Sequence, residues 1–103
     1  MAYCEKWIND IVDKYGTEYV YRQLAEECCE LAQASLKCIR AMNFETPVKP
    51  VESIDGVLEE IADVEIMIKF VRDGIFYGHL DMKIDQKKDY KKNRMIKRML
   101  GGD

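Results

Sequence analysis

The 103-residue chain has little of what marks the common catalytic classes. It contains one His and four Cys, and it has no C-x-x-C pair with a nearby His, which argues against a zinc site. It also lacks the G-x-x-x-x-G-K-[ST] motif of a P-loop and the G-x-S-x-G motif of acyl-transfer enzymes. No apolar run approaches the ~20 residues of a membrane span, and the first residues show no signal-peptide pattern. We therefore expect a cytoplasmic protein with reduced thiols and no membrane partner.

Proline is scarce as well, and its placement indicates an all-α chain. The only two prolines, Pro47 and Pro50, lie close together. Most Gly residues fall at the ends of segments with helical periodicity. The length predicts one domain, residues 1–103, with a modest core that oligomerisation would complete. We expect helices at about 3–14, 18–42, 54–72 and 82–100, with Ser53 and Asp81 as N-caps of the last two, and we leave 75–80 unassigned.

Carboxylates occur where a helix core is expected. Glu27 falls in one apolar stripe with Leu24 and Leu31, and Glu30 lies at its margin. Glu60 and Asp63 lie in the corresponding stripe of the next helix. Each pair has i, i+3 spacing, which places both side chains on one helix face. Because a buried ionised carboxylate costs several kcal/mol unless it is paired, and no Lys or Arg is interleaved, the pattern predicts a bound cation.

The neighbours Glu26 and Glu59 fit a solvated helix face about equally well. The donor set is oxygen only, which favours Mg²⁺, or Mn²⁺ as a substitute, over zinc or copper. A di-iron bundle would need Glu-x-x-His on its helices, and the single His79 lies outside both clusters. Mg²⁺ held by a few carboxylates commonly keeps positions open for substrate phosphates, so the pattern indicates phosphate chemistry.

The charge is distributed unevenly. Residues 83–98 contain eight Lys or Arg against two Asp, a net +6, so the rest of the chain carries −9 to give the total of −3. This basic segment predicts a place for an anion such as phosphate. Two other interpretations stay open, a solvated helix surface and a noncatalytic helical interaction module that binds nucleic acid. Few aromatic residues and no base-reading motif make nucleic acid the less favoured partner.

The order Glu26-Glu27-x-x-Glu30 followed by Glu60-x-x-Asp63 resembles the E-E-x-x-E and E-x-x-D signature of the MazG-like, all-α nucleoside triphosphate pyrophosphohydrolases. The surrounding residues 24–34 and 58–64 read like the small, often phage-associated members. The segment Lys91-x-x-Arg94-x-x-x-Arg98 looks like their basic C-terminal helix. The similarity covers about residues 23–101.

This resemblance implies a four-helix MazG-like fold and a Mg²⁺-dependent hydrolase that converts a nucleoside triphosphate to the monophosphate and pyrophosphate through a metal-activated water. Glu27, Glu30, Glu60 and Asp63 would bind metal, and Glu26 would support a second ion or orient the water. Lys91, Arg94 and Arg98 would contact the phosphates. Family members are homodimers or homotetramers. The candidates for stacking on the base are Trp7, Tyr21, Phe44 and Tyr77.

Overall fold

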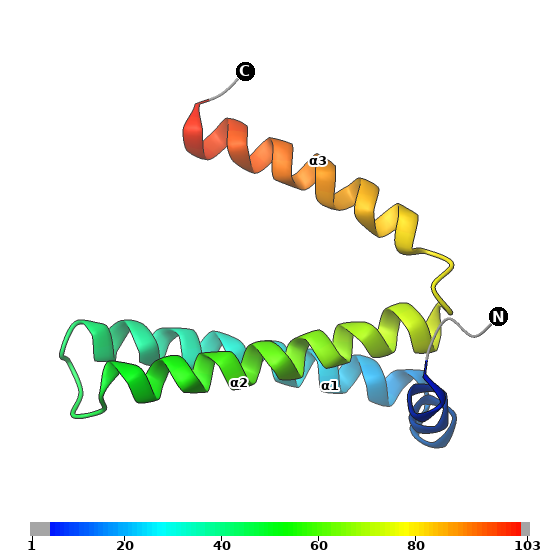
Figure 1. The fold of residues 1–103 in the computed structure, drawn as a ribbon, viewed down its shortest axis with the longest axis horizontal. Coiled ribbons are helices and arrows are strands. Elements are labelled where there is room, and N and C mark those ends of the chain that lie inside the picture. Colours follow the sequence, from blue (N-terminus) through cyan, green and yellow to red (C-terminus); the bar gives the residue numbers. More distant parts are fainter. Residues whose placement is uncertain (1–4, 102–103) are drawn as a thin grey trace.

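The computed structural model describes residues 5–101, and this part of the chain is helical without any strand. The elements are α1 (Lys6–Met42), α2 (Pro50–Lys69), a π-helix η1 (Phe70–Ile75) and α3 (Asp81–Leu100). Helices α1 and α2 pack side by side as an antiparallel hairpin, and α3 diverges from it (Figure 1). The predicted all-α class is confirmed. Residues 5–101 form three α-helical elements, where four helices were expected.

The difference in number arises at Gly16. This residue has φ 87° and ψ 166°, a non-helical conformation that glycine adopts without steric cost, so α1 consists of two helical arms joined by a kink. The shorter arm before Gly16 turns away from the hairpin axis and is seen nearly end-on in Figure 1. The break predicted between 14 and 18 is therefore present, as the kink at Gly16 between the two arms of α1.

The boundaries of α2 differ from the prediction at both ends. The helix begins at Pro50, which occupies its first turn, where the missing N–H of proline has no helical partner to lose. Ser53 is therefore inside the helix and is not its N-cap. After Lys69 the helical path continues as η1, which contains Gly74. A Cβ at Gly74 would lie 2.7 Å from Val12 Cγ2, so glycine allows η1 to approach the N-terminal arm closely.

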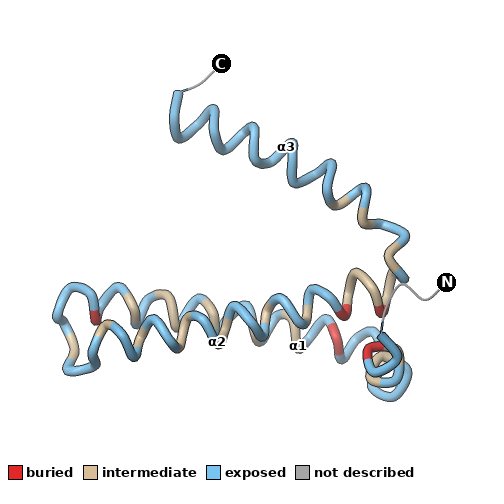
Figure 2. Tube along the Cα trace, viewed as in Figure 1, coloured by how far each residue is buried: buried red, intermediate tan, exposed pale blue. Residues whose placement is uncertain are grey.

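The core is small and lies where the N-terminal arm, the hairpin and η1 meet. Ile8, Val20 and Phe70 are buried together, and the rings of Trp7 and Phe70 meet edge to face at 5.5 Å. Ala41 is a separate buried residue near the other end of α1. Figure 2 shows how few positions along the described chain are fully buried. A single copy thus leaves most of its apolar side chains partly exposed.

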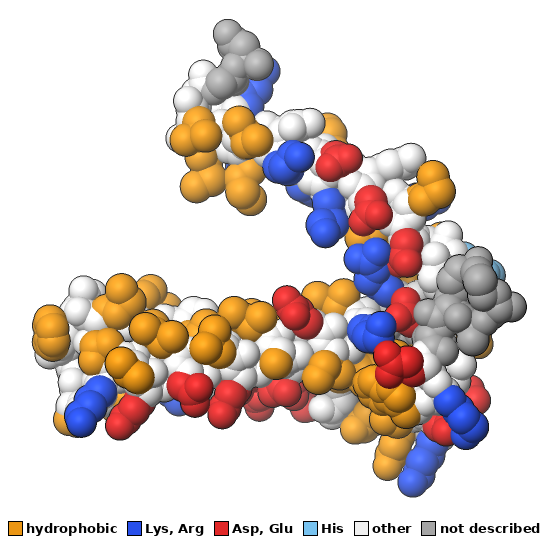
Figure 3. Space-filling model, in the orientation of Figure 1, with side chains coloured by type: hydrophobic (Ala, Val, Ile, Leu, Met, Phe, Trp, Pro, Cys, Tyr) orange, Lys and Arg blue, Asp and Glu red, His pale blue; other side chains and the backbone are white. Residues whose placement is uncertain are grey.

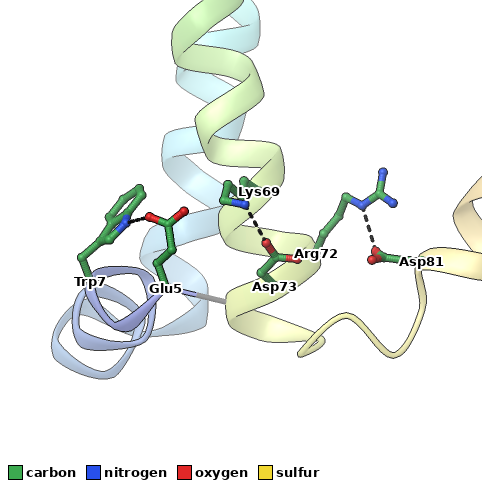
Figure 4. A network of polar contacts seen from close by, with 6 residues as sticks. All are labelled: Glu5, Trp7, Lys69, Arg72, Asp73 and Asp81. Carbon is green, nitrogen blue, oxygen red and sulfur yellow. Dashed lines mark hydrogen bonds and ion pairs between the residues drawn. The ribbon is translucent and has the colours of Figure 1, made fainter. Parts of the chain in front are cut away.

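Helix α3 is joined to the rest of the chain by a turn and by ion pairs. Asp81 was predicted to cap α3, but Leu80 holds that position, and the Asp81 carboxylate accepts a hydrogen bond from Arg72 Nε at 2.9 Å. Figure 4 shows this pair beside the Lys69–Asp73 ion pair of 3.1 Å. The unassigned segment consists of the end of η1 and a turn. No residue of α3 is buried.

A band of apolar side chains remains exposed on the hairpin. On α2 it comprises Ile54, Leu58, Ile61 and Ile68, and on α1 it includes Leu36 and Ile39. Their spacing of three, four or seven residues places each set along one side of its helix. In Figure 3 apolar side chains line the hairpin edge that faces α3, and acidic side chains gather along the opposite edge. We call the six residues the apolar face. None of the described helices is long and apolar enough to cross a membrane.

Candidate metal and substrate site

Three of the predicted carboxylates meet where α1 and α2 pack. Glu27 and Glu30 come from α1 and Glu60 comes from α2, and each offers an oxygen that lies within 4.8 Å of the other two. The i, i+3 spacing puts the first two on one face of α1, and the antiparallel hairpin brings α2 against that face. Glu27 and Glu60 are half-buried, and Glu30 is exposed. We call these three residues the carboxylate cluster.

The cluster contains buried oxygens that have no hydrogen-bond partner among residues 5–101 when all three carboxyl groups are ionised. Oε2 of Glu27 and Oε2 of Glu60 are inaccessible and accept no hydrogen bond. The ion pairs found among residues 5–101 all lie elsewhere. Leaving such acceptors unsatisfied is costly, and three carboxylates close together repel one another. A hard divalent cation such as Mg²⁺ suits this donor set, because it takes carboxylate oxygens and relieves both costs.

The electrostatics of the cluster raise two pKa values. Desolvation, followed by the charges of Glu30 and Asp63, a hydrogen bond with Glu30 and the charge of Glu60, raises the pKa of Glu27 to about 7. Desolvation, with the charges of Glu30 and Asp63, also raises the pKa of Glu60. In the absence of a cation, the cluster therefore holds a proton more tightly than ordinary carboxylates do.

The other two predicted acidic residues lie at the edge of this arrangement. Asp63 is exposed and outside the cluster, although its charge acts on both Glu27 and Glu60. Glu26 is exposed on α1 and is not one of the three residues whose oxygens form the cluster. The sequence thus predicted five acidic site residues, of which the single chain brings three to within 4.8 Å of one another.

The predicted phosphate-binding residues are on α3. Lys91, Arg94 and Arg98 are all exposed, and the guanidinium of Arg94 lies 5.8 Å from the ring centre of Tyr90. Because α3 has no extensive contact with α1 or α2, these cations do not lie beside the carboxylate cluster of their own chain. A role at the phosphates would require α3 of a second copy.

A cleft next to the cluster holds residues that the sequence reasoning missed. Its volume is about 640 Å³, within the range of small-molecule pockets. The lining comprises Glu30, Gln33, Ala34, Lys37 and Arg40 of α1, Thr46 and Val48 of the connecting loop, and Glu52, Ser53, Gly56 and Glu60 of α2. Two cations, Lys37 and Arg40, thus follow Glu30 along the same side of α1. Their positions at seven and ten residues after Glu30 are the signal that could have identified them.

The structure places the aromatic candidates for base stacking in different parts of the fold. Phe44 belongs to the loop after α1, two residues before Thr46 of the cleft, and its side chain is 86% exposed with φ 57°. Trp7 packs on Phe70 at the other end of the hairpin, and Tyr77 follows η1 there. Phe44 is therefore the candidate closest in the chain to the cleft.

Fold and site together define an all-α protein with a carboxylate cluster and a cleft between two antiparallel helices. Comparison with protein-family models, with curated proteins and with solved structures yields no match in any of the three.

The raised pKa of Glu27 predicts how stability depends on pH when chelator removes divalent ions. The folded chain keeps this proton up to about pH 7, whereas the unfolded chain releases it near the ordinary value of 4.5. The folded state thus binds more protons in this window, so stability should fall as pH rises from about 4.5 to 7 and change little above it. At pH 8 we expect Glu27→Gln to raise Tm by on the order of 5 °C.

Thermal denaturation in EDTA between pH 5 and pH 8 measures this effect. Glu26→Gln is the matched control, since it removes one exposed charge from the adjacent position and should keep the slope of the wild-type chain. A Glu27→Gln variant that shows the wild-type slope would mean that Glu27 is not the group that holds the proton.

Proposed function

We propose that the protein is a Mg²⁺-dependent nucleoside triphosphate pyrophosphohydrolase that releases a nucleoside monophosphate and pyrophosphate. The observation that carries this proposal is the convergence of Glu27, Glu30 and Glu60 from two helices, with buried oxygens that lack partners. The E-E-x-x-E and E-x-x-D pattern supports it, because the residues that meet are those the resemblance assigns to metal. The adjoining cleft provides room for a small-molecule substrate.

Each residue has a defined part in this proposal. Glu27, Glu30 and Glu60 would hold Mg²⁺ (Mn²⁺ could substitute), and Asp63 lies near enough to add its charge to the same site. Bound Mg²⁺ supplies charge neutralisation at the phosphates and a lowered pKa for water. Half-burial of Glu27 and Glu60 limits access of bulk water and strengthens electrostatic interactions there. Glu26 remains the candidate for supporting a second ion or orienting water.

The proposal includes a homo-oligomer, either a dimer or a tetramer. The apolar face on the hairpin is too extensive for an isolated small domain with so small a core. Pairing two hairpins through this face would complete a four-helix bundle of the MazG-like kind. None of the six residues of the apolar face lines the cleft, so such pairing can leave the cleft open.

A hydrolysis panel tests the proposed activity. Wild-type protein is incubated with each of the common ribonucleoside and deoxyribonucleoside triphosphates in Mg²⁺, and the products are separated by chromatography. We expect at least one substrate to yield monophosphate and pyrophosphate in equal amounts, with no product in EDTA. Release of orthophosphate and a nucleoside diphosphate would indicate a different reaction. Absence of turnover with both Mg²⁺ and Mn²⁺ across the panel would refute the enzyme proposal.

The free position of α3 favours one second candidate, a noncatalytic module that binds nucleic acid. All eight Lys and Arg residues between 83 and 98 are exposed in the single chain. Such a patch would give binding whose affinity falls steeply with salt. Salt-sensitive binding of DNA or RNA without nucleotide turnover in the same panel would favour this candidate over the hydrolase.

A further inference from the structure

We infer that the cleft beside the carboxylate cluster binds the phosphate chain of the substrate, with Lys37 as the nearer cation and Arg40 as the farther one. This inference rests on the proposed function, because it names the phosphate-binding side chains of that same site. It differs from the expectation that α3 supplies them, since both cations belong to α1 of the same chain as the carboxylates.

The positions along α1 support this assignment. Lys37 lies seven residues after Glu30, which is about 10.5 Å along a helix axis, and both line the cleft. Both side chains tilt toward the N-terminus of α1, and the longer lysine side chain can reach back over part of this gap. Arg40 follows nearly one turn later, toward the loop at the end of the hairpin (Figure 1). A phosphate chain held at the cluster and extended toward the loop passes both side chains.

The charges of the cleft are consistent with an anion. The lining contains three carboxylates, Glu30, Glu52 and Glu60, and two cations. Glu30 and Glu60 belong to the cluster that suits a divalent ion, so Glu52 is the one remaining carboxylate in the lining beside Lys37 and Arg40. Neither cation forms an ion pair within residues 5–101. Gln33, Thr46 and Ser53 add hydrogen-bonding side chains to the lining of the cleft.

Binding of inorganic pyrophosphate in the presence of Mg²⁺ tests the assignment. We expect Lys37→Met to weaken this binding about tenfold, and Lys37→Met combined with Arg40→Met about a hundredfold, because each charged hydrogen bond lost has an effect of this order. Titration with Mg²⁺ alone should give the wild-type dissociation constant, since the carboxylates are intact. Lys37→Arg, which keeps the charge, should restore most of the affinity. Lys97→Met on α3 is the matched control and should bind as wild type does.

Kinetics separate this inference from the proposed function. With a nucleotide that the wild-type chain hydrolyses, the double variant should show a raised KM. The fold-change in its kcat should be smaller than the fold-change in its KM. Wild-type pyrophosphate binding in the double variant, together with wild-type turnover, would overturn the role of Lys37 and Arg40 and leave the hydrolase proposal standing. Pyrophosphate binding that depends on Lys37, without turnover of any nucleotide by the wild-type chain, would support the anion site and refute the hydrolase. A loss in Lys97→Met equal to that in Lys37→Met would also overturn the inference.

Discussion

Replacement of Glu60 by Gln is expected to lower the rate of pyrophosphate release on the order of 10²–10³-fold, because it removes charge stabilisation worth several kcal/mol. Glu60 is the only member of the carboxylate cluster contributed by α2, and its Oε2 is buried without a partner. The amide has nearly the same shape, so packing between the helices should be retained. Its neutral oxygen is a weaker ligand for a hard cation, and affinity for Mg²⁺ should fall as well.

Glu59→Gln provides the matched control. Glu59 is exposed and adjacent in sequence, so this substitution changes the net charge equally without touching the cluster. Initial rates at saturating Mg²⁺, with denaturation curves in EDTA, distinguish a lost ligand from a lost fold. Since the pKa of Glu60 is raised by desolvation and nearby carboxylates, the Gln variant should be at least as stable as wild type without metal. Equal rates of pyrophosphate release for the two variants would show that Glu60 is not part of the active site.

The convergence of the carboxylates was predictable because it depends on local periodicity. An acidic residue in an apolar stripe must face whatever helix covers that stripe, and Glu27 and Glu60 are both half-buried as this argument requires. Glu30, at the margin of its stripe, is exposed but still within reach. Helical periodicity predicts the position of Asp63 less well, because this residue is exposed. One turn beyond Glu60, it remains close enough to act on the cluster electrostatically but lies outside it.

Features that depend on two elements could not be predicted in the same way. Lys37 and Arg40 look like ordinary surface cations of α1 until the loop and the first turns of α2 close the cleft around them. The direction of α3 depends on the turn after η1 and on the ion pair between Arg72 and Asp81, which are nine residues apart. Cys28 follows Glu27 in the helical stripe, where periodicity alone would place a core residue. It is exposed in the single chain, because α2 covers only part of α1.

A charge placed on the apolar face should have the second large effect. Leu58 is 58% exposed near the middle of α2, between Ile54 and Ile61 of the same face. If a second copy covers this face, Leu58→Lys buries an unpaired ammonium group at the interface, which costs several kcal/mol. We expect the assembly to dissociate to monomers at micromolar concentration, and Tm to fall by 10 °C or more, on the order given by the entropy of unfolding of a small domain. Light scattering and thermal denaturation measure the two effects.

Met82→Lys is the control for this experiment, because Met82 is 77% exposed at the start of α3 and lies outside the apolar face. It adds the same charge and should leave both mass and Tm close to wild-type values. The comparison is informative because the Leu58 side chain buries little of its surface within its own chain. With only four buried apolar residues in the described part, a monomer gains little from Leu58, so a large loss on substitution has to come from a partner. A Leu58→Lys chain with wild-type mass and Tm would show that this face stays in water and that the bundle is not completed through it.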